Sequence, residues 1–237
     1  MALERNTIPL EDWQPRTLLG RKVKGKEITT IDQILDAGEK ILEPEIVDSL
    51  LPGLHVELLE VGQSKGKFGG GKGSIWKQTQ KKTSEGNTIT FAAFAVVGNK
   101  NGYLGIGYGA AKETVPAREK AIRKAKLNLI KIRRGCGAWA CDCKQAHSLP
   151  FKVMGKSGSV RMTLIPAPRG TGLSVEKKCS RMISLAGIKD VYSKTQGSTA
   201  TKINLFKACF EALKHLEHVK IQPAFITLSG LIEGSTS

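Results

Sequence analysis

The sequence predicts an α+β protein with two small α/β-sandwich domains. Two stretches have the alternating or β-branched composition of strands, and each is followed by helices with one apolar face. The 237 residues, 40% of them hydrophobic, suffice for two cores. We divide the chain into an acidic extension at 1–54, a first domain at 55–135, a cysteine-rich linker at 136–150, a second domain at 151–218 and a tail at 219–237.

Charge is distributed unevenly along the chain. The formal net charge is +16, yet residues 1–60 carry −5 and residues 61–237 carry +21. Such a basic excess indicates a polyanionic partner, either nucleic acid or an acidic membrane surface. No apolar run approaches the ~20 residues that cross a bilayer, and the first residues lack a signal-peptide pattern. Five cysteines, an odd number, fit a reducing compartment, so we expect a cytoplasmic protein without a membrane partner.

Two short helices are expected in the acidic extension. Thr30 and Gln33 have the spacing of a capping box, in which the hydroxyl accepts from a helical amide and the Gln side chain reaches back. Pro44 suits the first turn of a second helix, which should stop at Pro52-Gly53. The extension is either a clasp on the first domain or a solubilising segment, and the sequence leaves both open.

The first domain should begin with strands and end with a helix. Strands are expected at 55–61 and 88–97, and a turn at Asn101-Gly102 should lead into a strand at 103–108. The helix expected at 115–130 has an alanine-rich apolar stripe that can lie close to the sheet. Its opposite face is basic, and we favour RNA or phosphate contact over simple solvation there.

A basic loop is expected at 63–82, with six lysines, five glycines and no acid. It should be mobile alone and ordered by a polyanion, because glycine lets the backbone approach phosphates and Trp76 or Phe68 can stack on an unpaired base. A nucleotide P-loop from Gly66 is disfavoured, since Gly73 stands where the magnesium-binding hydroxyl belongs. A solvated linker is the alternative.

The segment Gly105 to Ala110 matches the dinucleotide fingerprint G-x-G-x-x-A between a strand and a helix. Two facts count against that function. The preceding strand arrives through a tight hairpin, and residues 124–132 offer no acid for a ribose hydroxyl. We favour glycine packing against a helix, and an NAD-dependent enzyme remains an alternative.

The linker gathers three thiols and one imidazole in the pattern C-x4-C-x-C-x3-H. Structural zinc sites are tetrahedral and are commonly built from such ligands on short loops. The predicted zinc ligands are Cys136, Cys141, Cys143 and His147. A zinc ion there would fix the relative orientation of the two domains. The alternative is an unmetallated loop with cysteines as small buried hydrophobes.

Two further cysteines lie outside the linker, and two arginines directly precede it. Cys179 and Cys209 fall on the apolar stripes of expected helices, so we expect them in the core. Arg133 and Arg134 precede the linker. They could balance the thiolate charge or contact phosphate.

The second domain should open with a hairpin. Strands are expected at 151–154 and 159–165, followed by an irregular segment at 166–172 and a helix that ends at Gly187. A strand at 189–194 and a helix from about Thr201 to Leu216 complete the domain. We assign no function to the tail.

Several motifs in this order resemble the small-subunit ribosomal protein family S5, in its archaeal and eukaryotic branch. The motifs that carry the resemblance are Val97-Gly98-Asn99-Lys100-Asn101-Gly102-Tyr103, Gly105-Ile106-Gly107-Tyr108-Gly109, Ala110-Ala111-Lys112-Glu113, Arg133-Arg134-Gly135 and Leu164-Ile165-Pro166-Ala167-Pro168-Arg169-Gly170-Thr171-Gly172. The similarity runs from about Trp13 to Leu216, and the Gly-Cys-Gly-Ala-Trp segment looks archaeal. The stretch from Lys65 to Lys82 is longer than the family's usual hairpin loop, so loop contacts are not carried over.

The resemblance implies a first domain similar to a double-stranded-RNA-binding fold and a second βαβ-type domain with helices on one sheet face. It also implies a place near the mRNA entrance and the decoding region, with ribosomal RNA, mRNA and neighbouring small-subunit proteins as partners and a role in decoding accuracy. We therefore expect a ribosome-bound, non-catalytic protein without a small-molecule substrate. A zinc-dependent DNA-binding regulator is a further alternative.

The predicted RNA contacts combine the basic loop, the basic helix and the matched motifs. They are Lys65, Lys67, Lys72, Lys77, Lys81, Lys82, Lys100, Lys112, Arg118, Arg123, Lys126, Arg133, Arg134 and Arg169.

Overall fold

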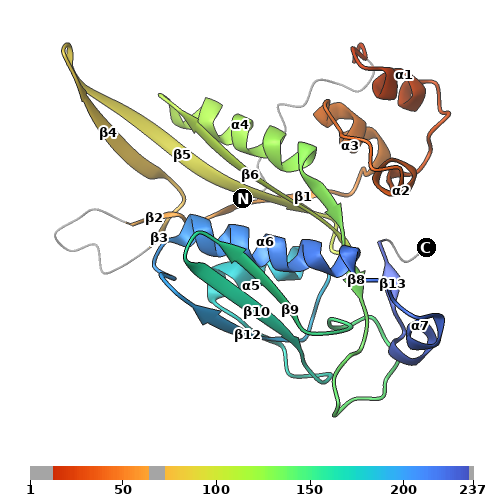
Figure 1. The fold of residues 1–237 in the computed structure, drawn as a ribbon. Coiled ribbons are helices and arrows are strands. Elements are labelled where there is room, and N and C mark those ends of the chain that lie inside the picture. The colour runs from red at the N-terminus through yellow and green to blue at the C-terminus, as the bar shows by residue number, and fades with distance from the viewer. Residues whose placement is uncertain (1–12, 64–72, 235–237) are drawn as a thin grey trace.

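The computed structural model describes residues 13–63 and 73–234 (Figure 1). The extension forms three short helices, α1 (Leu18–Lys24), α2 (Ile31–Asp36) and α3 (Pro44–Leu50). Sequence patterns indicated the second and third of these, and Pro44 does stand in the first helical turn. The capping-box prediction is wrong, because Thr30 makes no side-chain capping bond.

Apolar contacts hold these helices on the first domain. Ile34, Ile46 and Val47 are buried in one cluster with Tyr103 and Leu129 of the first sheet. The described part of the extension therefore packs on the first domain as a clasp would, and is not only a solubilising segment.

A buried carboxylate joins the start of the extension to α3. Glu43 accepts hydrogen bonds from the backbone amides of Arg16 (2.8 Å) and Thr17 (2.6 Å) and from Trp13 Nε1 (3.0 Å). Burial raises the pKa of Glu43, but the hydrogen bonds from Thr17, Arg16 and Trp13 outweigh it, and the net pKa lies below the ordinary value.

The first sheet is antiparallel and is organised around one long strand. Its strands are β1 (His55–Leu59), β4 (Lys77–Thr83), β5 (Gly86–Gly98), β6 (Tyr103–Ala111) and β7 (Leu129–Lys131). Strand β5 pairs along one edge with β4 and then with β1, and along the other edge with β6, which in turn pairs with β7. The β4–β5 ribbon projects beyond the other strands (Figure 1).

The structure confirms the turn predicted at Asn101-Gly102 but only part of the loop predicted at 63–82. The Asn101-Gly102 hairpin is confirmed, with Gly102 at a φ of +98°. The loop predicted at 63–82 is in part a strand, because residues 77–83 pair along their length with β5. Short strands β2 (Gly62–Gln63) and β3 (Gly73–Ser74) pair with each other. Lys65, Lys67 and Lys72 lie outside the described residues.

Helix α4 (Thr114–Leu127) lies directly against β6. Three strand glycines permit this close approach because a Cβ on any of them would collide with the helix backbone. For Gly107 the distance to the carbonyl oxygen of Ala121 would be 2.1 Å. The segment Gly105 to Ala110 is thus the interior of an antiparallel strand, which is not the phosphate-binding turn of a dinucleotide fold.

The second domain has helices on one face of its sheet, as predicted. Its elements are β9 (Val153–Ser157), β10 (Val160–Pro166), β11 (Leu173–Ser174), α5 (Lys177–Leu185), β12 (Val191–Gln196) and α6 (Lys202–His218). The sheet order is β11-β12-β10-β9, and β11 and β12 are parallel strands connected through α5. The first hairpin turns at Gly158, since β9 continues to Ser157.

The two domains share one core. Helices α5 and α6 lie between the sheets, so that α4, the first sheet, the two helices and the second sheet form successive layers (Figure 1). The ring of Phe94 on β5 is 5.2 Å from that of Phe206 on α6. Cys179 and Cys209 are fully buried in this core, as predicted. Apolar packing therefore orients the domains without a metal.

The tail folds back onto the junction between the domains. It contains α7 (Pro223–Ser229) and β13 (Ile232–Glu233), which pairs antiparallel with β8 (Arg133–Arg134). Within the described part of the chain, no helix combines the length and the apolar character that a membrane crossing requires.

Candidate metal centre and basic surface

Backbone hydrogen bonds close the cysteine loop at its base. Gly135 and Ser148 exchange two bonds of 3.0 Å, and the amide of Gly137 donates to the carbonyl of Leu149 at 3.1 Å. The amide of Cys136 donates to the carbonyl of Ser229 in α7 at 2.8 Å. The loop is thus held between the start of the second domain and the tail.

The four predicted zinc ligands come together inside this loop. The ligand atoms of Cys136, Cys141, Cys143 and His147 all lie within 4.8 Å of one another. Cys141 Sγ is 3.8 Å from His147 Nε2. A tetrahedral zinc with bonds of about 2.0–2.3 Å requires ligand separations of about 3.5–3.8 Å, so small side-chain shifts would complete the shell.

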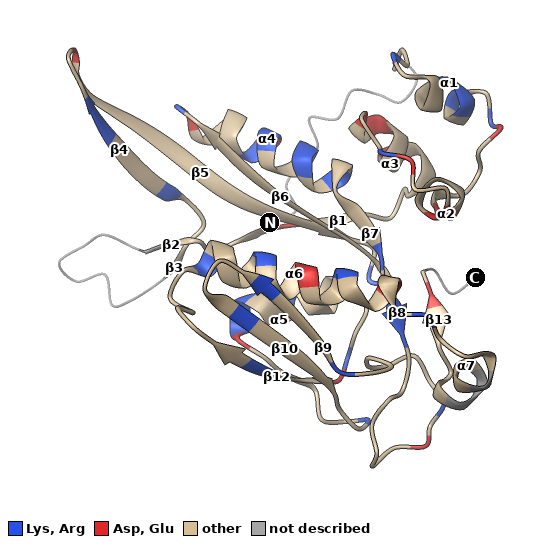
Figure 2. Ribbon diagram, in the orientation of Figure 1, with Lys and Arg blue, Asp and Glu red and all other residues tan. Residues whose placement is uncertain are grey.

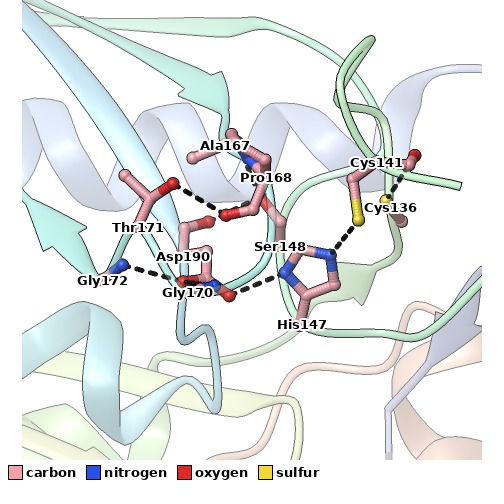
Figure 3. A network of polar contacts seen from close by, with 10 residues as sticks. All are labelled: Cys136, Cys141, His147, Ser148, Ala167, Pro168, Gly170, Thr171, Gly172 and Asp190. Carbon is pink, nitrogen blue, oxygen red and sulfur yellow. Dashed lines mark hydrogen bonds and ion pairs between the residues drawn. The ribbon is translucent and has the colours of Figure 1, made fainter. Parts of the chain in front are cut away.

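A buried aspartate orients the histidine (Figure 3). Nδ1 of His147 donates to Oδ2 of Asp190 at 2.8 Å, and both residues are about 95% buried. This bond leaves Nε2 facing the thiol of Cys141 (Figure 3). Zinc-bound histidines are commonly held in this way by a carboxylate on the other ring nitrogen.

The thiols have opposite tendencies to ionise. A backbone hydrogen bond from Arg169 and a hydrogen bond with the Cys143 side chain lower the pKa of Cys141 to about 6. Burial raises the pKa of Cys136 to about 11. The lowered pKa of Cys141 favours its thiolate, which is the form that binds a metal, and a divalent cation would offset the effect of burial on Cys136.

The two arginines before the loop are used within the protein. Arg133 donates to the carbonyls of Leu216 (3.1 Å) and Val219 (2.6 Å) and forms an ion pair with Glu233. Arg134 is buried and donates to the Asn101 side chain and the Gly234 carbonyl. Burial lowers its pKa. Arg133 thus joins the end of α6 to the tail, and Arg134 joins the hairpin turn to the tail.

Other predicted RNA contacts are divided by exposure. Lys126 is buried against Asp48 of α3, with Nζ 2.6 Å from Oδ2, and Arg118 is half-buried. The exposed members are Lys77, Lys81, Lys82, Lys100, Lys112, Arg123 and Arg169. They lie on β4, at the two ends of β6, on α4 and on the loop after β10 (Figure 2).

Sequence reasoning missed a second basic face. Lys156, Arg161 and Lys194 are exposed on neighbouring strands of the second sheet. Lys156 also lines a groove beside α6 with Lys207 and Lys214. Residues alternate between buried and exposed along β9 and β10. Because every second side chain of a strand with one covered face points to solvent, this alternation could have predicted the basic face.

The fold and these surfaces define the class of protein to which the chain belongs. The molecule is a basic, two-domain α+β protein whose exposed lysines and arginines form extended surfaces beside a candidate structural metal centre.

Family comparisons agree with that class. Residues 75–133 match the N-terminal domain model of ribosomal protein S5, and residues 155–224 match its C-terminal domain model. The chain belongs to the ribosomal protein S5 family. The cysteine loop falls between the two matched segments.

Curated archaeal relatives cover nearly the whole chain. A "Small ribosomal subunit protein uS5" of Nanoarchaeum equitans is 49% identical over 228 residues, covering 96% of this chain and 98% of that protein. A protein of the same name from Methanothermobacter thermautotrophicus is 47% identical over 211 residues, covering 89% and 91%. That of Pyrobaculum aerophilum is 47% identical over 216 residues, covering 91% and 92%. The predicted family and its archaeal branch are confirmed, and neither the NAD-dependent enzyme nor the DNA-binding regulator is supported.

Proposed function

We propose that this chain is a non-catalytic structural component of the small ribosomal subunit that binds ribosomal RNA. The observation that carries this proposal is the exposed β4–β5 ribbon, on which Lys77, Lys81 and Lys82 stand with every residue of β4 exposed (Figure 2). A two-stranded ribbon open on both faces has little core of its own. Phosphate contacts would hold it in place.

Membership of the S5 family supports a proposal for the position within the subunit. We place the chain near the mRNA entrance and the decoding region, bound to the ribosome in the cytoplasm, with neighbouring small-subunit proteins as further partners and a contribution to decoding accuracy. The order α3, β1, β5, β6, α4, with α3 in contact with α4, supports the similarity of the first domain to a double-stranded-RNA-binding fold.

The exposed members of the predicted set are the RNA contacts that we propose. Lys126, Arg133 and Arg134 are left out because their charges are already paired or buried within the protein. This choice separates surface cations from structural ones.

The test measures the salt dependence of binding to a small-subunit ribosomal RNA transcript. Replacing Lys77, Lys81 and Lys82 by Gln should reduce the slope of log K against log salt by about 2–3, since each phosphate contact contributes ~0.7–0.9. The matched control replaces the exposed Arg21 and Lys22 of α1 by Gln and should leave the slope unchanged. Equal slopes for wild type and the ribbon variant, or failure of the chain to co-sediment with small subunits at moderate salt, would contradict the proposal.

We also propose that the cysteine loop binds one zinc ion. Three thiolates and one imidazole at this separation, with a carboxylate behind the imidazole, support zinc over harder cations that prefer oxygen ligands. When bound, zinc would act as a structural cross-link of the loop.

Metal analysis of the purified full chain tests this site. Wild type should hold about one zinc per chain, and Cys141→Ser should lose most of it. Cys179→Ala, in the core, is the control that should retain the metal. Equal zinc in wild type and Cys141→Ser, or none in either, would show that the ligand set is wrong.

A further inference from the structure

Asp190 connects the candidate metal centre to the loop that presents Arg169. Its Oδ2 accepts from His147, and its Oδ1 accepts from the backbone amides of Gly170 (3.1 Å) and Gly172 (2.8 Å). Figure 3 shows these contacts around one carboxylate. A carboxylate that is 4% exposed needs such donors, because burial without them is costly.

The loop has a backbone shaped for this carboxylate. Gly170 and Gly172 adopt φ values of +88° and +73°, and a Cβ at either would meet nothing within 4 Å. Glycine is therefore required there for backbone conformation rather than for space. Arg169, which directly precedes Gly170, is exposed.

Two further contacts bind the loop to the same centre. Arg169 influences Cys141 directly, since its backbone is the largest cause of the lowered pKa of that thiol. The hydroxyl of Ser148 accepts from the amide of Ala167 (3.1 Å) and donates to the carbonyl of Asp190 (2.5 Å). The ligand His147 is thus joined to the loop through Asp190, and its neighbour Ser148 provides a second connection.

We infer that Asp190 is a positioning residue through which metal binding orders residues 166–172 and sets Arg169 for phosphate contact. The inference rests on the proposed zinc centre. A metal that fixes Cys141 and His147 also fixes the groups bonded to them, so the loop loses fewer conformations when it meets RNA. By linkage, zinc must strengthen RNA binding by the same factor by which RNA strengthens zinc binding.

The first experiment compares the wild-type chain with and without zinc, removed by a chelator at neutral pH. Hydrogen exchange should accelerate in 166–172 after removal, while β5 stays protected. Affinity for a small-subunit ribosomal RNA transcript should fall at least about fivefold. In Arg169→Gln, which keeps all four ligands, removal of zinc should leave the remaining RNA affinity unchanged.

The second experiment replaces Asp190 by Asn, which preserves shape but has one acceptor oxygen instead of two, so it cannot accept from both His147 Nδ1–H and the amides of Gly170 and Gly172. Zinc affinity, measured by competition with a chromophoric chelator, should fall about 10–100-fold. Asp142→Asn is the control, because Asp142 is an exposed acid between two of the ligands and should leave zinc affinity unchanged.

The outcomes separate this inference from the proposals on which it rests. If Asp190→Asn holds zinc as tightly as wild type, or if zinc removal changes neither exchange in 166–172 nor RNA affinity, the coupling is wrong although the zinc centre stands. If wild type binds no zinc, the centre itself fails and the coupling fails with it. The salt-slope test of RNA binding is independent of both results.

Discussion

Replacing Gly107 by Ala should destabilise the first domain strongly. A Cβ at this position would lie 2.1 Å from the carbonyl oxygen of Ala121 and 2.3 Å from the amide nitrogen of Ala125, both in the backbone of α4. A carbon and a carbonyl oxygen normally approach to about 3.3 Å. Helix α4 would therefore have to move away from β6 by about 1 Å.

The cost follows from what that displacement disrupts. Ala117, Ala121 and Ala125 are fully buried against the sheet, and moving the helix opens a gap along all of them. Overpacking of a core costs typically 1–3 kcal/mol, and we expect about 3 kcal/mol because the colliding atoms are backbone and cannot change rotamer. With a urea m value of about 3 kcal/mol/M, the unfolding midpoint should fall by about 1 M.

Urea unfolding followed by far-UV circular dichroism measures this shift. Gly53→Ala is the matched control, because Gly53 has open space for a Cβ and should change stability by less than about 0.5 kcal/mol. If both variants have the wild-type midpoint, the close packing of α4 on β6 is refuted. NAD should not change the midpoint of any of the three proteins, since Gly107 lies within a strand.

Two other variants test buried charges. Glu43→Gln should lower the free energy of unfolding by about 1–3 kcal/mol at pH 7; because the folded pKa of Glu43 is lowered, the difference from wild type should shrink as pH falls through that pKa, and a difference that persists in acid would contradict the assignment. Lys126→Met should lower the free energy of unfolding by about 1–3 kcal/mol, since it leaves Asp48 unpaired, and should not change the salt slope of RNA binding. Arg123→Met should reduce that salt slope and leave the free energy of unfolding unchanged.

Much of the fold could be predicted because local signals agreed with tertiary packing. The Asn101-Gly102 turn, the alanine stripe of α4 and the two helices of the second domain each follow from residue spacing. The cluster of four candidate metal ligands was also identifiable, since ligand-type side chains within so short a loop lie close together in most of its conformations. The burial of Cys179 and Cys209 followed from their helical positions.

Composition did not reveal contacts between segments, whether these are neighbouring or distant in the sequence. Strand β4 has the composition of a loop, but its pairing with β5 supplies backbone hydrogen bonds that composition does not reveal. Arg133 and Arg134 stand in a basic motif, yet the tail brings Glu233 and the Gly234 carbonyl to them. Neither contact has a local pattern, because the partners are about one hundred residues apart.

The shared core changes the role of the cysteine loop. A zinc ion is not needed to orient two domains whose sheets are already joined through the side chains of α5 and α6. The loop instead bonds to the tail through Cys136 and to the start of β12 through His147, whose carbonyl accepts from the amides of Lys189 (2.8 Å) and Asp190 (3.1 Å). A metal bound to the cysteine loop would therefore serve, under the proposal above, to restrict the loop and the neighbouring segment that carries Arg169.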